Sequence, residues 1–399
     1  VELLSERLVE KGINVVRMGN PVRVSEHLQK LTLDSKMDNH AANKERKNLE
    51  KQARAYTDMA HKYKRSFGKS EREQRKALFD EARKIRREID KIQDYIIDDV
   101  LDNVEVITAT LVGSNHPNIR ARQYETVIID EAAQSLEAAC WIPILKANRL
   151  IMAGDHCQLP PTVKSSTKLH EGLYNTLFEK LVIRFPSAVS LLDVQYRMNA
   201  QIMHYPSQVL YEGKLSAAPT VENWTLSNDS KPFNFIDTAG AGYEELIEEN
   251  AISNKDEALF LLRHLKEYIA TLCIEYSTED FPKIGIIAPY RQQSHFLKEL
   301  IYADDYLQSF YSFLQIHTID SFQGQEKDII YISLTRSNSN QQIGFLSDIR
   351  RMNVAMTRAK KKLILIGDSG TVGQHDFYKG MLDYVTSLDQ YHSVWEWAE

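Results

Sequence analysis

The chain has 399 residues, 43% of them hydrophobic and 26% charged, with a formal net charge of −6, a size and composition typical of a soluble protein of two domains. It contains no apolar run near 18 residues and no signal peptide, which argues against membrane insertion and secretion. Its three cysteines, Cys140, Cys157 and Cys273, have no CxxC spacing, which argues against disulfides and zinc and predicts a cytoplasmic location, or a nuclear one in a eukaryote.

The first long segment of the chain is basic, although the chain as a whole is acidic. Residues 36–91 contain 18 Lys and Arg against 10 Asp and Glu, a net charge of +8, which leaves −14 for the rest. Apolar residues recur in this segment at steps of three and four, which predicts two antiparallel helices that turn near Gly68. Two interpretations stay open: a solvated helical hairpin, or a surface that tracks nucleic-acid phosphates.

The predicted turn contains the letters FGKS, which partly match a phosphate-binding loop. Such a loop needs a glycine five residues before its Gly-Lys pair and a buried strand in front of it. Tyr63 stands at that position, inside a charged helix, and no other GK[ST] occurs in the chain. We therefore reject the match.

The stretch YETVIIDEAAQ carries a short β-branched run, Thr126 to Ile129, directly into Asp130 and Glu131. Such a run suits a strand covered on both faces of a parallel sheet, and ligands of such sheets gather at the carboxyl ends of the strands. An Asp that holds Mg²⁺ beside a Glu that activates water is an arrangement of phosphate-cleaving ATPases. Alone, the pattern favours a strand followed by a polar turn over a catalytic pair.

Five further apolar runs end in polar residues in the same way. They lie in RLIMAGDHCQLPP, AVSLLDVQYRM, KIGIIAPYRQQ, IHTIDSFQGQEKDIIYISLTRS and RRMNVAMTRAKKKLILIGD. Strands that alternate with helical stretches in this way predict an α/β layered protein with sites at the strand ends.

DEAAQ, GDHCQLPP, QYRM, TIDSFQGQEKD and RRMNVAMTRAK, in this order, resemble the motifs of superfamily 1 helicases. The resemblance runs from about residue 104 to 368 and is to the group of the nonsense-mediated-decay helicase, senataxin and the immunoglobulin-mu-binding helicase. It implies an α/β fold of two RecA-like parallel-sheet domains, residues 1–185 and 186–399, with a helical-hairpin insertion in the first at about 36–98. It also implies ATP with Mg²⁺ in the cleft between the domains and single-stranded DNA or RNA across their top.

The resemblance implies a catalytic role for five residues. Asp130 would hold Mg²⁺, Glu131 would polarise the attacking water and Gln158 would sense the γ-phosphate. Arg197 and Arg358 match the two arginines that the second domain of the family points at the transferring phosphoryl group.

Further residues are implied to hold the nucleotide. Tyr196 would stack on the base, Glu326 would hold the ribose, and Gly324 would let the backbone approach the triphosphate. For Arg351 an ion pair with a neighbouring carboxylate is an equal alternative to a functional role.

Strand binding is marked by four residues. Thr108 and Thr318 match positions at which the family hydrogen-bonds nucleic-acid phosphates, and Pro289 and Tyr290 would stack on a base. For each threonine, packing within a strand explains the residue equally well.

The chain departs from the family in lacking the phosphate-binding loop. We expect a fragment of a longer helicase, whose first sheet carries an open slot of unpaired backbone groups where a strand is missing. The first functional hypothesis is an ATP-dependent helicase or translocase in the longer protein, moving 5′ to 3′ as the family implies, with the chain as given inactive. The alternative is a catalytically inactive module that binds single strands or a protein.

Overall fold

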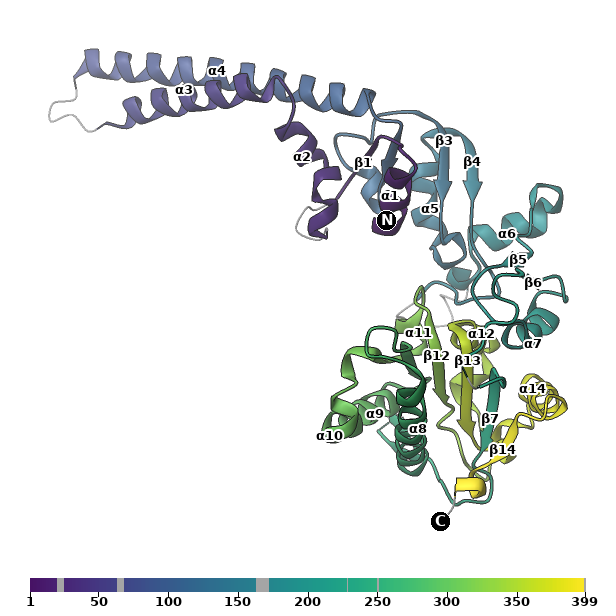
Figure 1. Ribbon diagram of the computed structural model, residues 1–399. Helices are drawn as coiled ribbons and strands as arrows, with labels where there is room; N and C mark the ends of the chain where they lie inside the picture. The colour runs from purple at the N-terminus through teal and green to yellow at the C-terminus, as the bar shows by residue number, and fades with distance from the viewer. Residues whose placement is uncertain (20–24, 63–67, 163–171, 228, 250, 398–399) are drawn as a thin grey trace. The chain divides into compact units, whose positions relative to one another are not determined.

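The computed structural model describes residues 1–19, 25–62, 68–162, 172–227, 229–249 and 251–397 (Figure 1). The chain divides into two compact units, Val1–Ala153 and Gly154–Glu399. Both are α/β with parallel strand pairs, which confirms the predicted fold class. The predicted domain edge at residue 185 lies downstream of this division and stays a prediction.

The first unit contains two separate pairs of parallel strands. β1 (Val15–Arg17) pairs with β2 (Val106–Thr108), and β3 (Tyr124–Ile129) pairs with β4 (Ala147–Met152). Its other short elements are α1 (Glu2–Glu10), η2 (Glu26–Leu31), α2 (Leu33–Asp38), η3 (Val112–Asn115), η4 (Ala132–Gln134) and α5 (Glu137–Ile144). Among the described residues the two pairs are not joined into one sheet, so each pair has strand edges without a partner strand. The open slot expected in the first sheet stays a prediction.

The strand in front of the acidic pair is less buried than its sequence predicts. In β3 the side chain of Ile128 is 66% exposed, and its partner Ile151 in β4 is 47% exposed. The prediction that this run is covered on both faces is therefore wrong for this chain. The reason is that two strands alone, with no layer over this face among the described residues, cannot enclose alternating side chains on both sides.

The basic segment forms the predicted pair of helices. α3 (Asn43–His61) and α4 (Lys69–Asp102) run antiparallel along each other (Figure 1). They pack through a small core of Ala53, Ile85 and Ile89. The connecting residues 63–67 lie outside the described part of the chain, and α4 begins directly after Gly68.

The second unit is built on a parallel sheet of six strands. Their order is β11 (Leu314–Thr318), β10 (Ile284–Ala288), β12 (Lys327–Ser333), β13 (Ala359–Gly367), β7 (Phe233–Asp237) and β14 (Tyr391–Ser393). Two short strand pairs lie outside this sheet: β5 (Val194–Gln195) with β6 (Ser216–Ala217), and the hairpin of β8 (Leu246–Glu248) with β9 (Ala251–Ser253). This sheet confirms the expected layered architecture.

Helices cover both faces of this sheet, and consecutive strand residues alternate between the two cores. In β13, Leu363 and Leu365 enter the core shared with α7 (Ala200–Leu210), α12 (Ile349–Met356) and α14 (Asp376–Ser387). Ile364 and Ile366 enter the core shared with α8 (Lys255–Glu275) and α9 (Arg291–Ala303). The other elements are α6 (Leu177–Arg184), η6 (Pro186–Ala188), α10 (Asp305–Gln308), η7 (Tyr311–Phe313), α11 (Ile319–Phe322), η8 (Gly344–Ser347), α13 (Ser369–Val372) and η9 (Val394–Trp397). A continuous apolar run is the form that a doubly covered parallel strand takes.

Among the described residues, no helix has the length and hydropathy that a membrane span requires.

Candidate functional site

The acidic pair lies at the carboxyl end of β3, as predicted, and both side chains are exposed. The Asp130 carboxylate accepts a hydrogen bond from the backbone N–H of Glu131 at 3.0 Å through Oδ1. Glu131 has a left-handed backbone conformation, with φ 54° and ψ 38°, which is uncommon for a residue with a Cβ. Gln134 donates a hydrogen bond from its amide to the Glu131 carboxylate. A strained turn and a side-chain donor thus fix the direction of Glu131.

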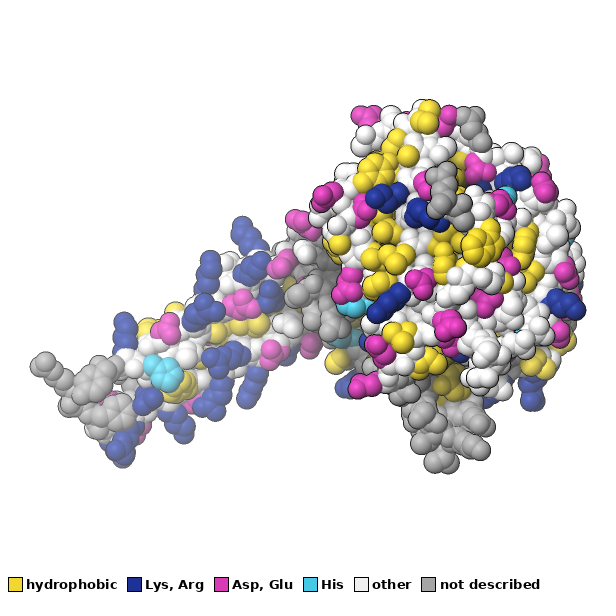
Figure 2. All heavy atoms as spheres, turned by 90° about the horizontal axis from the view of Figure 1, so that it is seen from below, with side chains coloured by type: hydrophobic (Ala, Val, Ile, Leu, Met, Phe, Trp, Pro, Cys, Tyr) yellow, Lys and Arg dark blue, Asp and Glu magenta, His cyan; other side chains and the backbone are white. Residues whose placement is uncertain are grey.

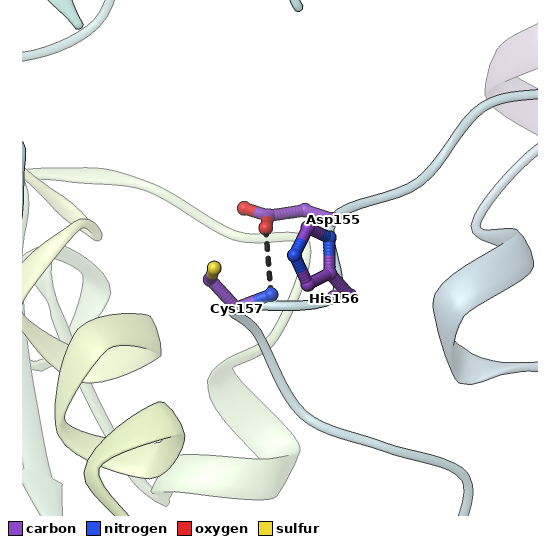
Figure 3. A group of neighbouring side chains, drawn as sticks. All are labelled: Asp155, His156 and Cys157. Carbon is purple, nitrogen blue, oxygen red and sulfur yellow. Dashed lines mark hydrogen bonds between the residues drawn. The ribbon is translucent and has the colours of Figure 1, made fainter. Parts of the chain in front are cut away.

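Gln158 is held by Asp155 in the turn after β4. Its amide donates to Asp155 Oδ2 at 2.7 Å, and the hydroxyl of Tyr211 donates to the same oxygen at 2.6 Å. The Asp155 Oδ1 atom accepts from the backbone N–H of Cys157 at 2.9 Å, as the dashed line in Figure 3 shows. Asn353 in α12 holds this turn by donating to the Cys157 carbonyl at 2.9 Å. The sequence predicted Gln158 but not the carboxylate that positions it.

Asp155, His156 and Cys157 place three potential metal-ligand atoms within 4.8 Å of one another (Figure 3). Three donors already occupy the carboxylate of Asp155. Burial, with a contribution from Asp155, raises the pKa of the Cys157 thiol to about 11, and the thiol donates to the carbonyl of Leu210 at 3.2 Å. A protonated thiol and a saturated carboxylate are poor ligands, so this turn is a structural element that supports Gln158.

The QYRM turn orients Arg197. The Gln195 side chain accepts hydrogen bonds from the backbone N–H groups of Arg197 and Met198, both at 2.7 Å, and so closes the turn. The guanidinium of Arg197 donates from Nε to Glu326 Oε2 at 2.7 Å, and Lys360 lies 2.8 Å from the other oxygen of that carboxylate. Burial alone would raise the pKa of Glu326, but hydrogen bonds from Lys360 and Arg197 lower it below its usual value. Glu326 is therefore ionised and anchors two cations.

Arg358 lies beside this group. It is buried, and its guanidinium Nε donates to the carbonyl of Val354 at 2.9 Å. Arg197 donates to the carbonyl of Thr357, the preceding residue, at 3.2 Å, which joins the two arginines through the backbone. Their side chains are thus fixed by the same short segment between α12 and β13.

The remaining nucleotide candidates differ in accessibility. Gly324 has φ +77°, and a Cβ added there would meet nothing within 4 Å, so a ligand can approach its backbone. The side chain of Tyr196 is 72% exposed, which leaves its ring accessible. Arg351 donates to both carboxylate oxygens of Asp320 at 3.2 Å, which matches the ion-pair alternative.

The second unit carries its candidate residues at two ends of the sheet. Glu326 directly precedes β12 and Arg358 directly precedes β13, and the first residues of these strands are in register. These residues therefore lie at the amino ends of the strands, and the expectation that all sites gather at the carboxyl ends is wrong for them. The reason is that the chain enters β12 and β13 at this edge from a turn and from α12. Pro289 and Thr318, in contrast, lie at the carboxyl ends of β10 and β11.

The predicted strand-binding residues are only partly supported. Thr108 is buried, and its hydroxyl lies 2.8 Å from that of Ser5, so packing explains it. Tyr290 is buried too: its ring packs at 5.3 Å from that of Phe345, and its hydroxyl accepts from Arg336 at 3.1 Å. Pro289 is also buried. The prediction that Pro289 and Tyr290 stack on a base is therefore not supported, whereas the partly exposed Thr318 remains a candidate.

Two family models match the chain, both described as "AAA domain", one over residues 1–166 and the other over 173–370. "DNA-binding protein SMUBP-2" of Mesocricetus auratus is 33% identical, over 100% of this chain and 40% of that protein. "Uncharacterized ATP-dependent helicase MJ0104" of Methanocaldococcus jannaschii is 31% identical, over 97% of this chain and 62% of that protein. "Helicase sen1" of Schizosaccharomyces pombe is 35% identical, over 74% of this chain and 18% of that protein.

This chain belongs to the superfamily 1 helicases. Within them it falls in the senataxin and immunoglobulin-mu-binding group, which confirms the resemblance carried by the five motifs. The chain spans less than two thirds of the length of each relative named above.

Three residues of this helicase chain that sequence reasoning left without a role support the candidate site. Gln134 holds Glu131, Asp155 holds Gln158, and Lys360 shares Glu326 with Arg197. Each lies within the motifs already quoted: Gln134 and Asp155 are three residues from the residue they hold, and Lys360 follows Arg358 by two residues. Position within a motif was the available signal, but which side chain turns toward which is decided by the turn geometry.

Proposed function

We propose that this chain forms the nucleotide-hydrolysing and strand-binding part of an ATP-dependent helicase that moves 5′ to 3′ on a single strand of DNA or RNA. The observation that carries the proposal is the group of Arg197, Glu326 and Lys360 beside Arg358, inside motifs of the helicase family. Oriented guanidinium groups are what phosphoryl transfer requires against the oxygens of the transferring group. The names of the relatives, DNA-binding protein and helicase, support the substrate class.

The residues present fit ATP with Mg²⁺. Carboxylate oxygens suit Mg²⁺, and Asp130 is exposed, with no partner for its Oδ2 atom within the part of the chain that the structure describes. The open space at Gly324 fits a close approach of phosphate to backbone. Asp130 would hold the ion, which supplies positive charge beside the phosphates when bound.

The residues of the chain would then divide the work. Glu131, oriented by Gln134, would polarise the attacking water as a general base. Arg197 and Arg358 would stabilise the negative charge that spreads over the transferring phosphoryl group. Tyr196 would stack on the base of the nucleotide, while Glu326 would hold the ribose in addition to orienting Arg197.

We also propose that these 399 residues alone do not hydrolyse ATP, because the sequence contains no GxxxxGK[ST] loop. In this proposal the loop is contributed by sequence outside the chain. The alternative, a binding module that hydrolyses nothing, shares the same strand-binding residues.

Strand-stimulated phosphate release tests the proposal on the 399-residue chain and on the whole natural protein. We expect background release from the chain and stimulated release from the whole protein, abolished there by Glu131→Gln. Duplexes with a 5′ or a 3′ single-stranded tail test direction, and unwinding should require the 5′ tail. Stimulated release from the chain alone, lost in Glu131→Gln, would contradict its proposed inactivity, and a whole protein that binds strands without hydrolysis would favour the binding module.

A further inference from the structure

Within α4, the net positive charge lies in the distal half of the helix. In α4, residues 69–87 contain 8 Lys and Arg against 4 Asp and Glu, a net +4, whereas residues 88–102 contain 1 against 6, a net −5. A hairpin that only needed solubility has no reason to separate its charges along the helix. The separation directs an anionic ligand to the distal half and away from the base.

A groove runs along this distal half. It is lined by Arg72, Arg75, Lys76, Phe79, Arg83 and Arg86, and it has a volume of about 520 Å³. These positions recur at steps of three, four and seven, so they share one face of α4. From Arg72 to Arg86, this face extends over about 21 Å along the helix. Figure 2 shows Lys and Arg side chains gathered along the hairpin.

The floor of the groove is aromatic. The ring of Phe79 is partly buried, with His61 of α3 edge-on at 5.2 Å and the guanidinium of Arg75 at 5.6 Å from its centroid. Arg75 is thus oriented by the ring and by the turn of helix below it. An apolar floor between cations gives a base or a sugar a place to lie.

Four cations of the groove, Arg72, Lys76, Arg83 and Arg86, are weakly engaged by the protein itself. Arg83 pairs with Asp80 at 2.7 Å, but both side chains are more than half exposed, so water screens the pair. Arg86 donates to the hydroxyl of Thr57 at 3.2 Å. Within the described ranges, no carboxylate pairs with Arg72 or Lys76. Their charge is available to a ligand.

We propose that this groove binds the phosphate backbone of a single nucleic-acid strand, with an unpaired base or sugar against Phe79. This proposal rests on the proposed function. It adds a contact between the protein and the strand on the hairpin. Five cations in a row over about 21 Å match several successive phosphates, whereas one phosphorylated side chain would engage only one or two of them. Because phosphate contacts carry no sequence information, binding is independent of base sequence.

Two quadruple variants of the whole natural protein separate the groove from general electrostatics. The groove variant carries Arg72→Gln, Lys76→Gln, Arg83→Gln and Arg86→Gln. The control carries Lys69→Gln, Lys84→Gln, Arg87→Gln and Lys91→Gln, all on α4 but outside the groove. Each variant loses four positive charges, and glutamine has a helix propensity similar to that of lysine and arginine. Circular dichroism checks that the helices persist.

Strand affinity is measured by fluorescence anisotropy with an oligothymidylate over a range of salt concentrations. We expect the groove variant to bind about tenfold or more weakly and its slope of log affinity against log salt to flatten by about 2, from roughly 0.7 for each of three phosphates. The control should retain its slope, and Phe79→Ala should weaken the single strand more than a blunt duplex. Equal losses of strand affinity in the two quadruple variants would refute the proposal, because long-range electrostatic attraction alone would then explain binding.

The outcomes also separate this inference from the proposed function. Unchanged binding in the groove variant, in a protein that still binds and unwinds, refutes the groove and leaves the helicase intact. Weaker binding to phosphatidylserine vesicles or to a phosphopeptide, with strand affinity unchanged, would assign the groove to another anion and likewise refute the proposal. A wild-type protein that binds no strand at any salt concentration refutes the proposed function itself.

Discussion

At the scale of single residues, Glu257 is a fully buried acidic residue of the second unit. Its carboxyl group is fully buried at the start of α8, where Oε1 accepts from the hydroxyl of Ser333 and from the backbone N–H of Thr335. The other oxygen, Oε2, has no partner among the described residues. Burial raises the pKa of Glu257 to about 8. A neutral carboxyl group therefore suits this site better than a carboxylate.

This pKa predicts a stability change with pH. The folded chain holds a proton that the unfolded chain releases once pH exceeds about 4.5, so the stabilisation is present below that pH and is lost as pH rises through about 8. In the wild type, the free energy of unfolding should fall by on the order of a few kcal/mol between low pH and pH 9 because of this group. We expect Glu257→Gln, whose side chain stays neutral, to remove that fall.

Urea unfolding of the wild type and the variant between pH 6.5 and 9 measures the difference. The lower limit avoids His264, whose pKa burial lowers from 6.5 to about 4, so that its contribution to stability is lost only on the acid side. The free energies of unfolding of the Gln variant and the wild type should differ less at pH 6.5 than at pH 9. At pH 9 the Gln variant should be the more stable of the two. Parallel curves over the whole range would show that Glu257 is ionised in the folded chain.

At the scale of elements, the hairpin is a small structure held by few apolar contacts. Ala53 of α3 and Ile85 and Ile89 of α4 form its core, with Leu49 and Tyr56 packed against them. Long helices with so little shared core depend strongly on each buried side chain, because isolated helices are marginal in water. The groove therefore depends on this core for its shape.

Ile85→Ala should loosen the hairpin without affecting the second unit. Deleting a buried isoleucine side chain typically costs about 2–4 kcal/mol, and the small core offers little to fill the cavity. We expect faster amide hydrogen exchange throughout α3 and α4, with α8 and the six-stranded sheet unchanged. Lys84→Ala, on the exposed neighbouring position, is the control and should leave exchange as it is. Unchanged protection in Ile85→Ala would mean that the hairpin is stabilised by contacts other than this core.

At the scale of the whole molecule, the residues proposed for hydrolysis come from both units of the chain. Asp130 and Glu131 belong to the first, while Gln158, Arg197 and Arg358 belong to the second. A reaction that needs residues of both units should fail when either contribution is removed, even if each unit folds normally.

Arg358→Gln in the whole natural protein should lower kcat of ATP hydrolysis by about 10³-fold and leave strand affinity nearly unchanged, because the guanidinium acts on the transition state. Arg197→Gln should behave alike. Lys361→Gln is the control, since Lys361 pairs with Asp328 at 3.7 Å near the same segment and has no proposed part in hydrolysis. Thermal unfolding must show that Arg358→Gln remains folded, because its guanidinium also bonds the backbone of α12. Near-normal turnover in both arginine variants would show that the site is assigned wrongly.

Patterns in the sequence were enough to predict the family, the parallel α/β fold, the antiparallel hairpin and the position of the acidic pair at the end of β3. These follow from local patterns: apolar period, motif letters and strand-end residues, each of which acts over a few positions. It also identified Gln158, Arg197 and Glu326 as residues to watch.

Which side chains meet depends on the fold. Tyr290 was a candidate for stacking on a base, but it is buried with its ring against Phe345 of η8, and the hydroxyl of Thr108 is hydrogen-bonded to that of Ser5. Arg358 and Glu326 lie at the amino ends of their strands because the register of β12 with β13 brings two distant motifs to one edge. Burial of Ile128 could not be judged from β3 alone, since coverage depends on which strands and helices surround it. Such contacts join residues far apart in sequence, and no local pattern encodes them.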